Sequence, residues 1–188
     1  EIAADESKMY DYTLKSRTVA VISDGSAILG LGNLGHKASL PVMEGKCVLF
    51  KEFAGVDAFP VIVKKQDVEE FIQTVKNIAD TFGGINLEDI SSPRCFEIEE
   101  RLKAELDIPV MHDDQHGTAI VTLAGIINAC KVTNRQISDL KVVINGVGAA
   151  GTAIAKLFLN YGVKDIVMVD SKGAIYEGRE GLNSEKEM

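Results

Sequence analysis

The chain has 188 residues, of which 46% are hydrophobic and 26% are charged, and its formal net charge is −8 at pH 7. This composition is typical of a globular protein that can bury a sizeable core. The negative charge argues against nucleic acid or an anionic membrane surface as a partner, because either would repel the molecule as a whole. A small anionic substrate stays compatible with it if local cations hold that substrate.

Features that would mark secretion or membrane insertion are missing from the sequence. No apolar run approaches the roughly 20 residues that a membrane-spanning helix needs, and residues 1–6 lack the basic and apolar parts of a signal peptide. The three cysteines are odd in number and widely spaced, which predicts reduced thiols rather than disulfides or a metal site. We therefore expect a cytoplasmic protein.

Strand-like and helix-like segments alternate along the first part of the chain. Runs rich in β-branched residues predict strands, and the helix after Asp67 has one apolar face and a capping pattern of Asp67 with Glu70. A helix interrupted near Pro41 and Gly45 is expected within residues 38–53. The other expected elements are strands at 17–23, 59–63 (buried), 85–87 and 108–111, and helices at 67–82 and 92–106, the latter with Glu97/Arg101 and Glu99/Lys103 as exposed pairs.

The second part predicts a long apolar helix over residues 115–131, followed by a polar stretch, 132–139, that is the best candidate for a linker. Residues 141–145, 149–161 and 165–170 then read as strand, helix and strand. Strands that alternate with helices predict an α/β fold with mainly parallel sheets. Because the chain starts at Glu1 rather than Met and residues 180–188 complete no predicted element, we expect a portion of a longer protein.

The pattern GxGxxG occurs twice, and its context decides between the copies. The second copy comprises Gly146, Gly148 and Gly151, with Ala149 and Ala150 between them, and it joins a predicted strand directly to a predicted helix. Its amides would face a pyrophosphate at the helix N-terminus, as in a Rossmann-type dinucleotide site. The alternative is a tight turn that binds no nucleotide.

Asp170 stands at the end of the next predicted strand, where such sites place an acidic residue. Its carboxylate would accept hydrogen bonds from a ribose diol and repel a 2'-phosphate, which favours NAD slightly over NADP. Ser171 and Lys172 could instead hold that phosphate, so both cofactors stay open.

The first GxGxxG copy, residues 30–35, lies several residues after its strand and leads into the segment that contains Pro41 and Gly45. No clean βαβ unit is expected around it. We interpret it as unrelated to dinucleotide binding, although its glycines could let the backbone approach a ligand.

Two pairs of acidic residues, Glu88-Asp89 and Asp113-Asp114, follow two predicted strands. Ligands of parallel α/β folds bind at the carboxyl ends of strands, so these carboxylates could converge there on a hard cation such as Mg²⁺ or Mn²⁺. The alternative is that each acid merely caps the next helix.

Lys46 lies among apolar neighbours, and burial beside a metal would favour its neutral amine, which could act as a base. The alternative is a surface lysine with a buried stem. His112 and His116 are four residues apart but straddle a predicted turn, so a zinc site is not expected.

The residues quoted so far, with FGGINLEDI at 82–90, HDDQHGTA at 112–119 and LGLGNLG at 29–35, resemble malic enzymes of the short bacterial type. The resemblance covers nearly the whole chain. It implies a substrate and metal domain at residues 1–114, followed by the start of an NAD(P)-binding domain at 115–188. It also implies oxidation of L-malate and its decarboxylation to pyruvate with NAD or NADP and a divalent metal.

The resemblance further implies roles for individual residues. Glu88, Asp89 and Asp114 would bind the metal, and Lys46 would be the general base for the C2 hydroxyl. Asp113 would be a carboxylate of the substrate site or a support for the metal ligands. The dinucleotide would be held by Gly146, Gly148, Ala149, Ala150, Gly151 and Asp170.

Two departures from the family pattern limit these roles. The tyrosine of a Tyr-Thr-Pro stretch, the acid that protonates C3 in this family, has no counterpart, and Ala27 replaces a substrate-binding arginine of larger eukaryotic relatives. We therefore expect the 188 residues alone to be inactive or nearly so. A malolactic-type enzyme that releases lactate, or a non-catalytic metal- or nucleotide-binding module, stays as an alternative. A homodimer is the expected assembly.

Overall fold

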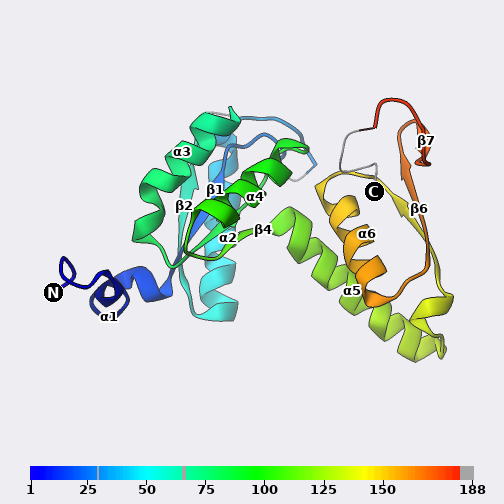
Figure 1. Ribbon diagram of the computed structural model, residues 1–188, viewed down its shortest axis with the longest axis horizontal. Coiled ribbons are helices and arrows are strands. Elements are labelled where there is room, and N and C mark those ends of the chain that lie inside the picture. Colours follow the sequence, from blue (N-terminus) through cyan, green and yellow to red (C-terminus); the bar gives the residue numbers. More distant parts are fainter. Residues whose placement is uncertain (29, 65–66, 183–188) are drawn as a thin grey trace. The chain divides into compact units, whose positions relative to one another are not determined.

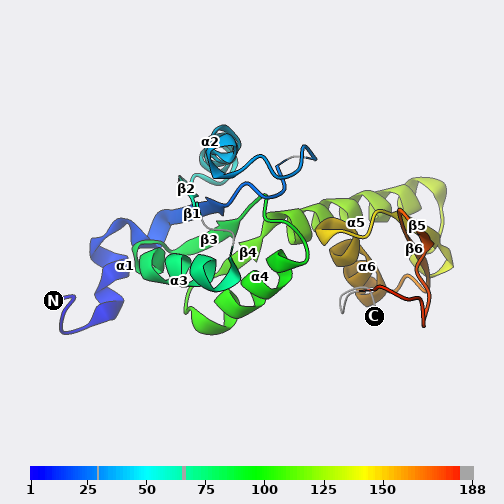
Figure 2. The ribbon, with the colours of Figure 1, turned by 90° about the horizontal axis from the view of Figure 1, so that it is seen from above.

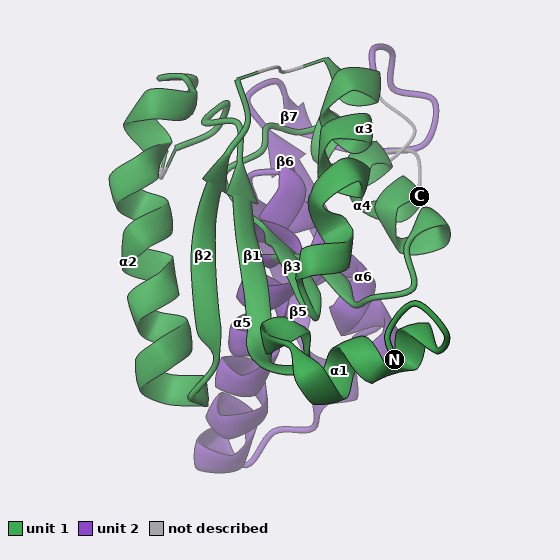
Figure 3. Ribbon diagram, turned by 90° about the vertical axis from the view of Figure 1, so that its left-hand side faces the viewer, with its two compact units in different colours: residues 1–112 green, residues 113–188 purple. Residues whose placement is uncertain are grey.

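The computed structural model describes residues 1–28, 30–64 and 67–182. The chain divides into two compact units, Glu1–His112 and Asp113–Met188 (Figure 3), and each unit has its own sheet. Pairing is parallel in all but one of the strand pairs, which confirms the predicted α/β fold with mainly parallel sheets. Within the described residues, no helix is long and apolar enough to span a bilayer.

The sheet of unit 1 has the strand order β2-β1-β3-β4, and all its pairs are parallel (Figure 1). The carboxyl ends of the strands therefore meet at one edge, where Ile22 pairs with Leu87 and Leu87 pairs with His112. The segments that follow these strands begin side by side. The strands are β1 (Thr18–Ser23), β2 (Asp57–Ile62), β3 (Gly84–Leu87) and β4 (Val110–His112).

Helices cover both faces of this sheet: α2 (His36–Ala54) lies on one face, and α3 (Val68–Ile78) and α4 (Arg94–Glu105) lie on the other (Figure 2). The apolar stripe of α3 is buried, and the Asp67 side chain accepts a hydrogen bond from the Glu70 amide at 3.0 Å, as the capping pattern predicted. Residues before β1 form α1 (Met9–Tyr12) between two short 3-10 helices, which we did not predict. The core side chains include Val21, Ile22, Phe71, Ile72, Val75, Leu87, Ile98 and Leu102.

The predicted interruption of the helix near Pro41 and Gly45 is wrong, because α2 runs unbroken through both residues. Pro41 lies in the second turn, so its missing N–H removes one helical hydrogen bond close to the N-terminus rather than in the middle. Gly45 costs only about 1 kcal/mol in a helix interior. Packing of α2 on β1 and β2 outweighs these local penalties.

The strand predicted as buried at 59–63 is β2, an edge strand whose residues are half-buried or exposed. Pro60 fits this position because an edge strand has one side without a partner that needs an N–H donor. The prediction failed because a short apolar run looks the same in a central strand and an edge strand.

The prediction that no βαβ unit surrounds the first GxGxxG copy is also wrong. β1, α2 and β2 form a parallel strand-helix-strand unit, and Gly35 directly precedes α2. The sequence did not indicate this unit, because α2 begins many residues after the end of β1. That the first GxGxxG copy is unrelated to dinucleotide binding stays a prediction.

Unit 2 contains α5 (Asp113–Thr133), β5 (Lys141–Asn145), α6 (Ala149–Tyr161), β6 (Asp165–Asp170) and β7 (Gly173–Ala174). The bounds of β5, α6 and β6 are the predicted ones, whereas the short antiparallel β7 was not predicted. α5 packs along α6. We predicted that residues 132–139 link two domains. This prediction is wrong, because these residues lie within unit 2 and include a short 3-10 helix, Ile137–Asp139.

Candidate functional site

Glu88 and Asp89 follow β3 directly and are almost fully buried, with 4% and 2% of their surface exposed. The Glu88 amide donates to the carbonyl of Ile22, and the Asp89 carbonyl accepts from the amide of Ala27, so the end of β1 and its loop fix both residues. Asp89 has a left-handed backbone (φ 54°), which Asp tolerates better than most residues. Helix capping does not explain these acids, since α4 begins only at Arg94 with Pro93 as its N-cap.

Asp113 and Asp114 form the first turn of α5 and follow His112 without a break. Because His112 pairs with Leu87, the peptide chain brings Asp114 near the residues after β3. One oxygen each from Glu88, Asp89 and Asp114 lies within 4.8 Å of the others, and among the described residues this is the group suited to a metal ion. An all-carboxylate set fits Mg²⁺ or Mn²⁺. Neither His112 nor His116 belongs to it.

Lys46, in the middle of α2, points toward this cluster. Its Nζ lies 3.3 Å from Oε2 of Glu88, and only 25% of its side chain is exposed. The same Glu88 oxygen accepts a hydrogen bond of 2.9 Å from Nδ2 of Asn86, a buried residue within β3. The ion pair and the partial burial set this side chain apart from a surface lysine whose amine lies in water. Asn86 was missed, because an Asn inside a strand gives no local sign of its partner.

The side chain of Asp113 lies against its own helix. A Cβ atom added at Gly117, one turn later, would stand 2.2 Å from Oδ1 of Asp113. The absence of a side chain at Gly117 is therefore what leaves room for this carboxylate. The geometry identifies Gly117 as a residue that determines where Asp113 points, which sequence reasoning did not detect.

A second polar group follows β1. Asp24 is fully buried, and its carboxylate binds the Arg94 guanidinium and accepts hydrogen bonds from the amide and hydroxyl of Ser26. The Ser26 hydroxyl also accepts from Arg94 at 2.9 Å and from the amide of Ser91 at 2.9 Å. These bonds connect the loop after β1 to the loop after β3. An Asp directly after a buried strand was the available signal in the sequence.

Glu99 also differs from expectation. We predicted an exposed pair with Lys103, and the pair exists at 2.8 Å, but Glu99 is only 5% exposed. Its Oε1 accepts the backbone N–H of His112 at 2.9 Å. Helical spacing identified the partner on the same helix but could not reveal that this face of α4 meets β4.

In unit 2 the glycine turn joins β5 to α6 through backbone that only glycine fits at two positions. Gly146 has φ 114°, and a Cβ added at Gly151 would lie 1.9 Å from the carbonyl oxygen of Gly146, so no larger residue fits there. Gly148 is the N-cap of α6, no side chain caps the helix, and a Cβ at Gly148 would meet no described atom within 4 Å. The amides that begin α6 at Ala149 and Ala150 are thus suited to a phosphate.

Asp170 ends β6, as predicted, and is held by two hydrogen bonds. Its Oδ1 accepts from Arg179 Nη2 at 2.7 Å and from the Lys172 amide at 2.9 Å. Arg179 also donates to the carbonyls of Gly173 and Ala174. The ion pair reduces the negative charge that Asp170 presents, a feature that the sequence did not indicate.

Family models match both parts of the chain. The model described as "Malic enzyme, N-terminal domain" matches residues 3–67 and 63–103, and that described as "Malic enzyme, NAD binding domain" matches residues 115–188. The chain belongs to the malic enzyme family. The resemblance drawn from the sequence is thereby confirmed.

Individual relatives agree with the family models. A "Bifunctional malic/malolactic enzyme" of Bacillus subtilis (strain 168) is 63% identical over 187 residues, which are 99% of this chain and 46% of that protein. A "NAD-dependent malic enzyme" of Geobacillus stearothermophilus is 62% identical over 175 residues, 93% of this chain and 37% of that protein. The crystal structure of a NAD-dependent malic enzyme from Thermotoga maritima superposes with a TM-score of 0.95 at 52% identity, covering 98% of this chain and 50% of that one. The chain thus spans about half or less of the length of these malic enzymes.

Proposed function

We propose that the protein containing this chain oxidises L-malate and decarboxylates the product to pyruvate and CO₂, using NAD⁺ or NADP⁺ and Mg²⁺ or Mn²⁺. The observation that carries this proposal is the contact of Lys46 with Glu88, one of three acidic residues whose oxygens lie together. The carboxylates favour the ammonium form of this lysine, and a cation bound to them would offset their charge and favour the neutral amine that can accept a proton. Membership of the malic enzyme family supports the choice of substrate and reaction.

Glu88, Asp89 and Asp114 are the residues that would hold the cation. Three carboxylates so close repel one another, and a divalent ion would relieve that repulsion. When bound, the ion would supply a Lewis acid that stabilises negative charge on the C2 oxygen of the substrate. The hydrogen bonds from Asn86 to Glu88 and from Ala27 to Asp89 would keep two of the ligands in place.

Lys46 would act as the general base. Its neutral amine would take the proton of the C2 hydroxyl while the hydride on C2 leaves for the nicotinamide ring, so that the C–O bond becomes a carbonyl. Breaking the bond between C3 and the departing carboxylate would then give CO₂ and the enolate of pyruvate. The Lys46 ammonium can return its proton to the enolate oxygen, and protonation at C3 would complete the conversion to pyruvate. Asp113, placed one residue before Asp114, would contribute a carboxylate to the substrate site or support the ligands.

The glycine turn of unit 2 would bind the dinucleotide. The amides at the start of α6 would receive the pyrophosphate, while Asp170 would accept hydrogen bonds from the ribose hydroxyls. This arrangement favours NAD slightly. The ion pair with Arg179 weakens the preference, because the guanidinium is a cation that a 2'-phosphate could use.

A malolactic reaction, which would release lactate, is the second candidate function. The observation in its favour is the name of the Bacillus subtilis relative, a "Bifunctional malic/malolactic enzyme". Product analysis of the full-length protein separates the two: pyruvate with stoichiometric NADH or NADPH supports the malic reaction, and lactate without net reduced cofactor supports the malolactic one.

Replacing Asp114 tests the metal assignment directly. We expect Asp114→Asn in the full-length protein to raise the Mn²⁺ dissociation constant about tenfold or more, because a neutral amide is a weaker ligand than a carboxylate. Asp139→Asn, an exposed acid in the same unit, is the matched control and should bind Mn²⁺ normally. Unchanged Mn²⁺ affinity in Asp114→Asn would contradict the proposal.

We also propose that the full-length protein is cytoplasmic and forms a homodimer, because the resemblance is to a family that is usually oligomeric. Light scattering of the purified protein tests the assembly, and a monomeric mass would contradict it.

A further inference from the structure

Glu99 is a buried carboxylate to which the mechanism above assigns no role. It lies on α4 with 5% of its surface exposed, accepts the backbone N–H of His112 at 2.9 Å, and pairs with Lys103 at 2.8 Å. Burying an ionised carboxylate is unfavourable unless it is paired and hydrogen-bonded. The place of His112 in the fold therefore indicates which function the buried Glu99 carboxylate serves.

Among the described residues, no strand lies beyond β4 to pair with the N–H of His112. β4 is an edge strand of its sheet, and the carbonyl of Pro109 faces β3, because it accepts the amide of Ile85. Backbone groups point to alternate sides along a strand, so the amide of His112, three residues later, faces the open edge. The Glu99 carboxylate supplies the hydrogen-bond acceptor that a neighbouring strand would otherwise provide.

His112 is also the point where β4 becomes α5. Asp113 and Asp114 follow it directly, and Leu87, its partner in β3, directly precedes Glu88 and Asp89. We propose that Glu99 is a positioning residue: it fixes the end of β4 and thereby helps to keep the Asp114 carboxylate within reach of Glu88 and Asp89. This inference rests on the proposed metal-binding function of those carboxylates.

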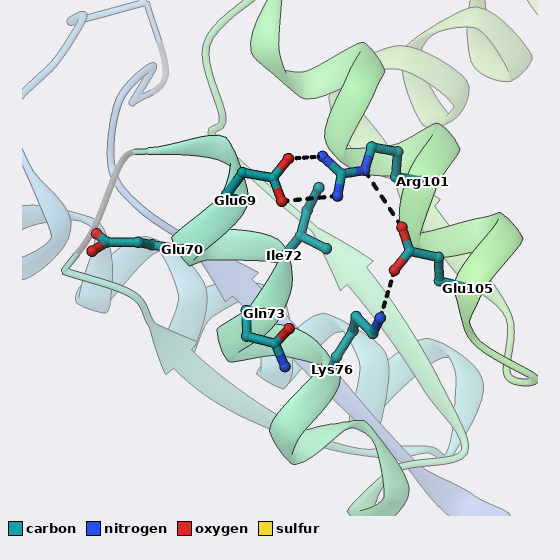
Figure 4. A pocket seen from close by; sticks show the side chains of 7 residues that line it. All are labelled: Glu69, Glu70, Ile72, Gln73, Lys76, Arg101 and Glu105. Atoms are coloured by element: carbon teal, nitrogen blue, oxygen red, sulfur yellow. Dashed lines mark hydrogen bonds and ion pairs between the residues drawn. The ribbon is translucent and has the colours of Figure 1, made fainter.

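α4 is itself anchored at both ends, as a positioning role requires. At its N-terminus Arg94 binds the buried Asp24 and Ser26 in the loop after β1. Near its C-terminus Arg101 forms two hydrogen bonds with Glu69 of α3, and Glu105 pairs with Lys76 of α3 (Figure 4). A helix tied to two neighbouring elements can hold His112 in a defined place.

The test is Mn²⁺ binding to the full-length protein, followed by the electron paramagnetic resonance signal of free Mn²⁺, with thermal unfolding measured in parallel. Glu99→Met fills the same space with an apolar side chain but accepts no strong hydrogen bond. We expect it to raise the Mn²⁺ dissociation constant about tenfold or more. It should also lower the unfolding temperature, because the buried N–H of His112 loses its acceptor. Glu99→Gln keeps an acceptor oxygen and should restore most of the affinity.

Two further variants separate positioning from general stability. Lys103→Met breaks the ion pair but keeps the acceptor for His112, so its Mn²⁺ affinity should equal that of the wild type. Leu102→Ala empties a fully buried position on the same helix and should lower the unfolding temperature without changing Mn²⁺ affinity. Normal affinity in Glu99→Met, or an equal loss in Leu102→Ala, would overturn the positioning role. A wild-type protein that binds no Mn²⁺ would instead overturn the proposed function, and the inference with it.

Discussion

The amine of Lys46 lies 3.3 Å from the carboxylate of Glu88, although the two residues are 42 positions apart in the sequence. Lys46 comes from a helix on one face of the sheet and Glu88 from the end of β3, so the contact depends on how α2 packs. Asn86 donates to the same oxygen of Glu88 and keeps it in place. This pair joins the candidate base to a candidate metal ligand within one unit.

Replacing Lys46 with alanine should separate catalysis from metal binding. We expect Lys46→Ala in the full-length protein to lower kcat by about 10²- to 10⁴-fold, the usual contribution of a general base, while Mn²⁺ still binds. Steady-state kinetics and Mn²⁺ titration provide the two measurements. Lys51→Ala is the matched control, because Lys51 lies on the same helix in an exposed ion pair with Asp57. Near-normal turnover in Lys46→Ala would refute the base assignment.

Gly117→Ala should disturb Asp113 without weakening the helix. Alanine favours a helix by about 1 kcal/mol over glycine, so the unfolding temperature should stay equal or rise. The new methyl group would occupy the position of the Asp113 carboxylate, which must then turn away. We expect kcat/KM for malate to fall about tenfold to hundredfold, as misplaced active-site groups do.

Gly125→Ala is the control for that experiment, because Gly125 is an exposed residue of α5 with no described atom near its added Cβ. It should gain stability and keep full activity. If Gly117→Ala were as active as Gly125→Ala, Asp113 would have no role in the reaction.

Much of unit 2 could be predicted because the signals are local. A strand ends at Asn145, the glycines follow immediately, and the helix period starts at Ala149, so the bounds of β5, α6 and β6 came from neighbours in sequence. The acids that follow β3 and β4 could be identified for the same reason. Neighbouring parallel strands have their carboxyl ends at the same edge of the sheet, so residues that follow them can be predicted to lie together.

The supporting residues could not be predicted, because their partners are distant in sequence. Arg94 binds Asp24, and Glu99 binds the amide of His112, through contacts that form only when α4 packs on the sheet. Local rules also misjudged α2, since penalties at Pro41 and Gly45 were weighed without its tertiary contacts. The predicted division into domains 1–114 and 115–188 stays a prediction for the longer protein.

Asp170→Ala should change the cofactor preference. The substitution removes the proposed acceptor for the ribose hydroxyls and leaves the Arg179 guanidinium without its carboxylate. A hydrogen bond to a charged group contributes about 1.5–3 kcal/mol, so the ratio of kcat/KM for NAD⁺ to that for NADP⁺ should fall about tenfold or more. Asp165→Ala, at the exposed start of the same strand, should leave the ratio unchanged. An unchanged ratio in Asp170→Ala would exclude Asp170 from cofactor selection.

The ion-pair network between α3 and α4 predicts that the stability of unit 1 falls slightly at acid pH. Four residues, Glu69, Arg101, Glu105 and Lys76, form an alternating chain of charges along a surface pocket (Figure 4). The hydrogen bond from Arg101 lowers the pKa of Glu69, and the hydrogen bond from Lys76 lowers the pKa of Glu105. Both carboxylates therefore bind protons less readily in the folded protein than in the unfolded chain.

The sign of the effect follows from those lowered pKa values. The stabilisation is fully present above the usual glutamate pKa of 4.5 and is lost as the pH falls through the lower folded-state values. Arg101→Met should remove the part of this dependence that comes from Glu69, so its unfolding temperature should fall less than that of the wild type over the same acid range. The difference should be small and should shrink in high salt, because the groups are exposed to solvent. Circular dichroism melts at several pH values and two salt concentrations measure it, and parallel curves for the two proteins would show that the network adds no stability.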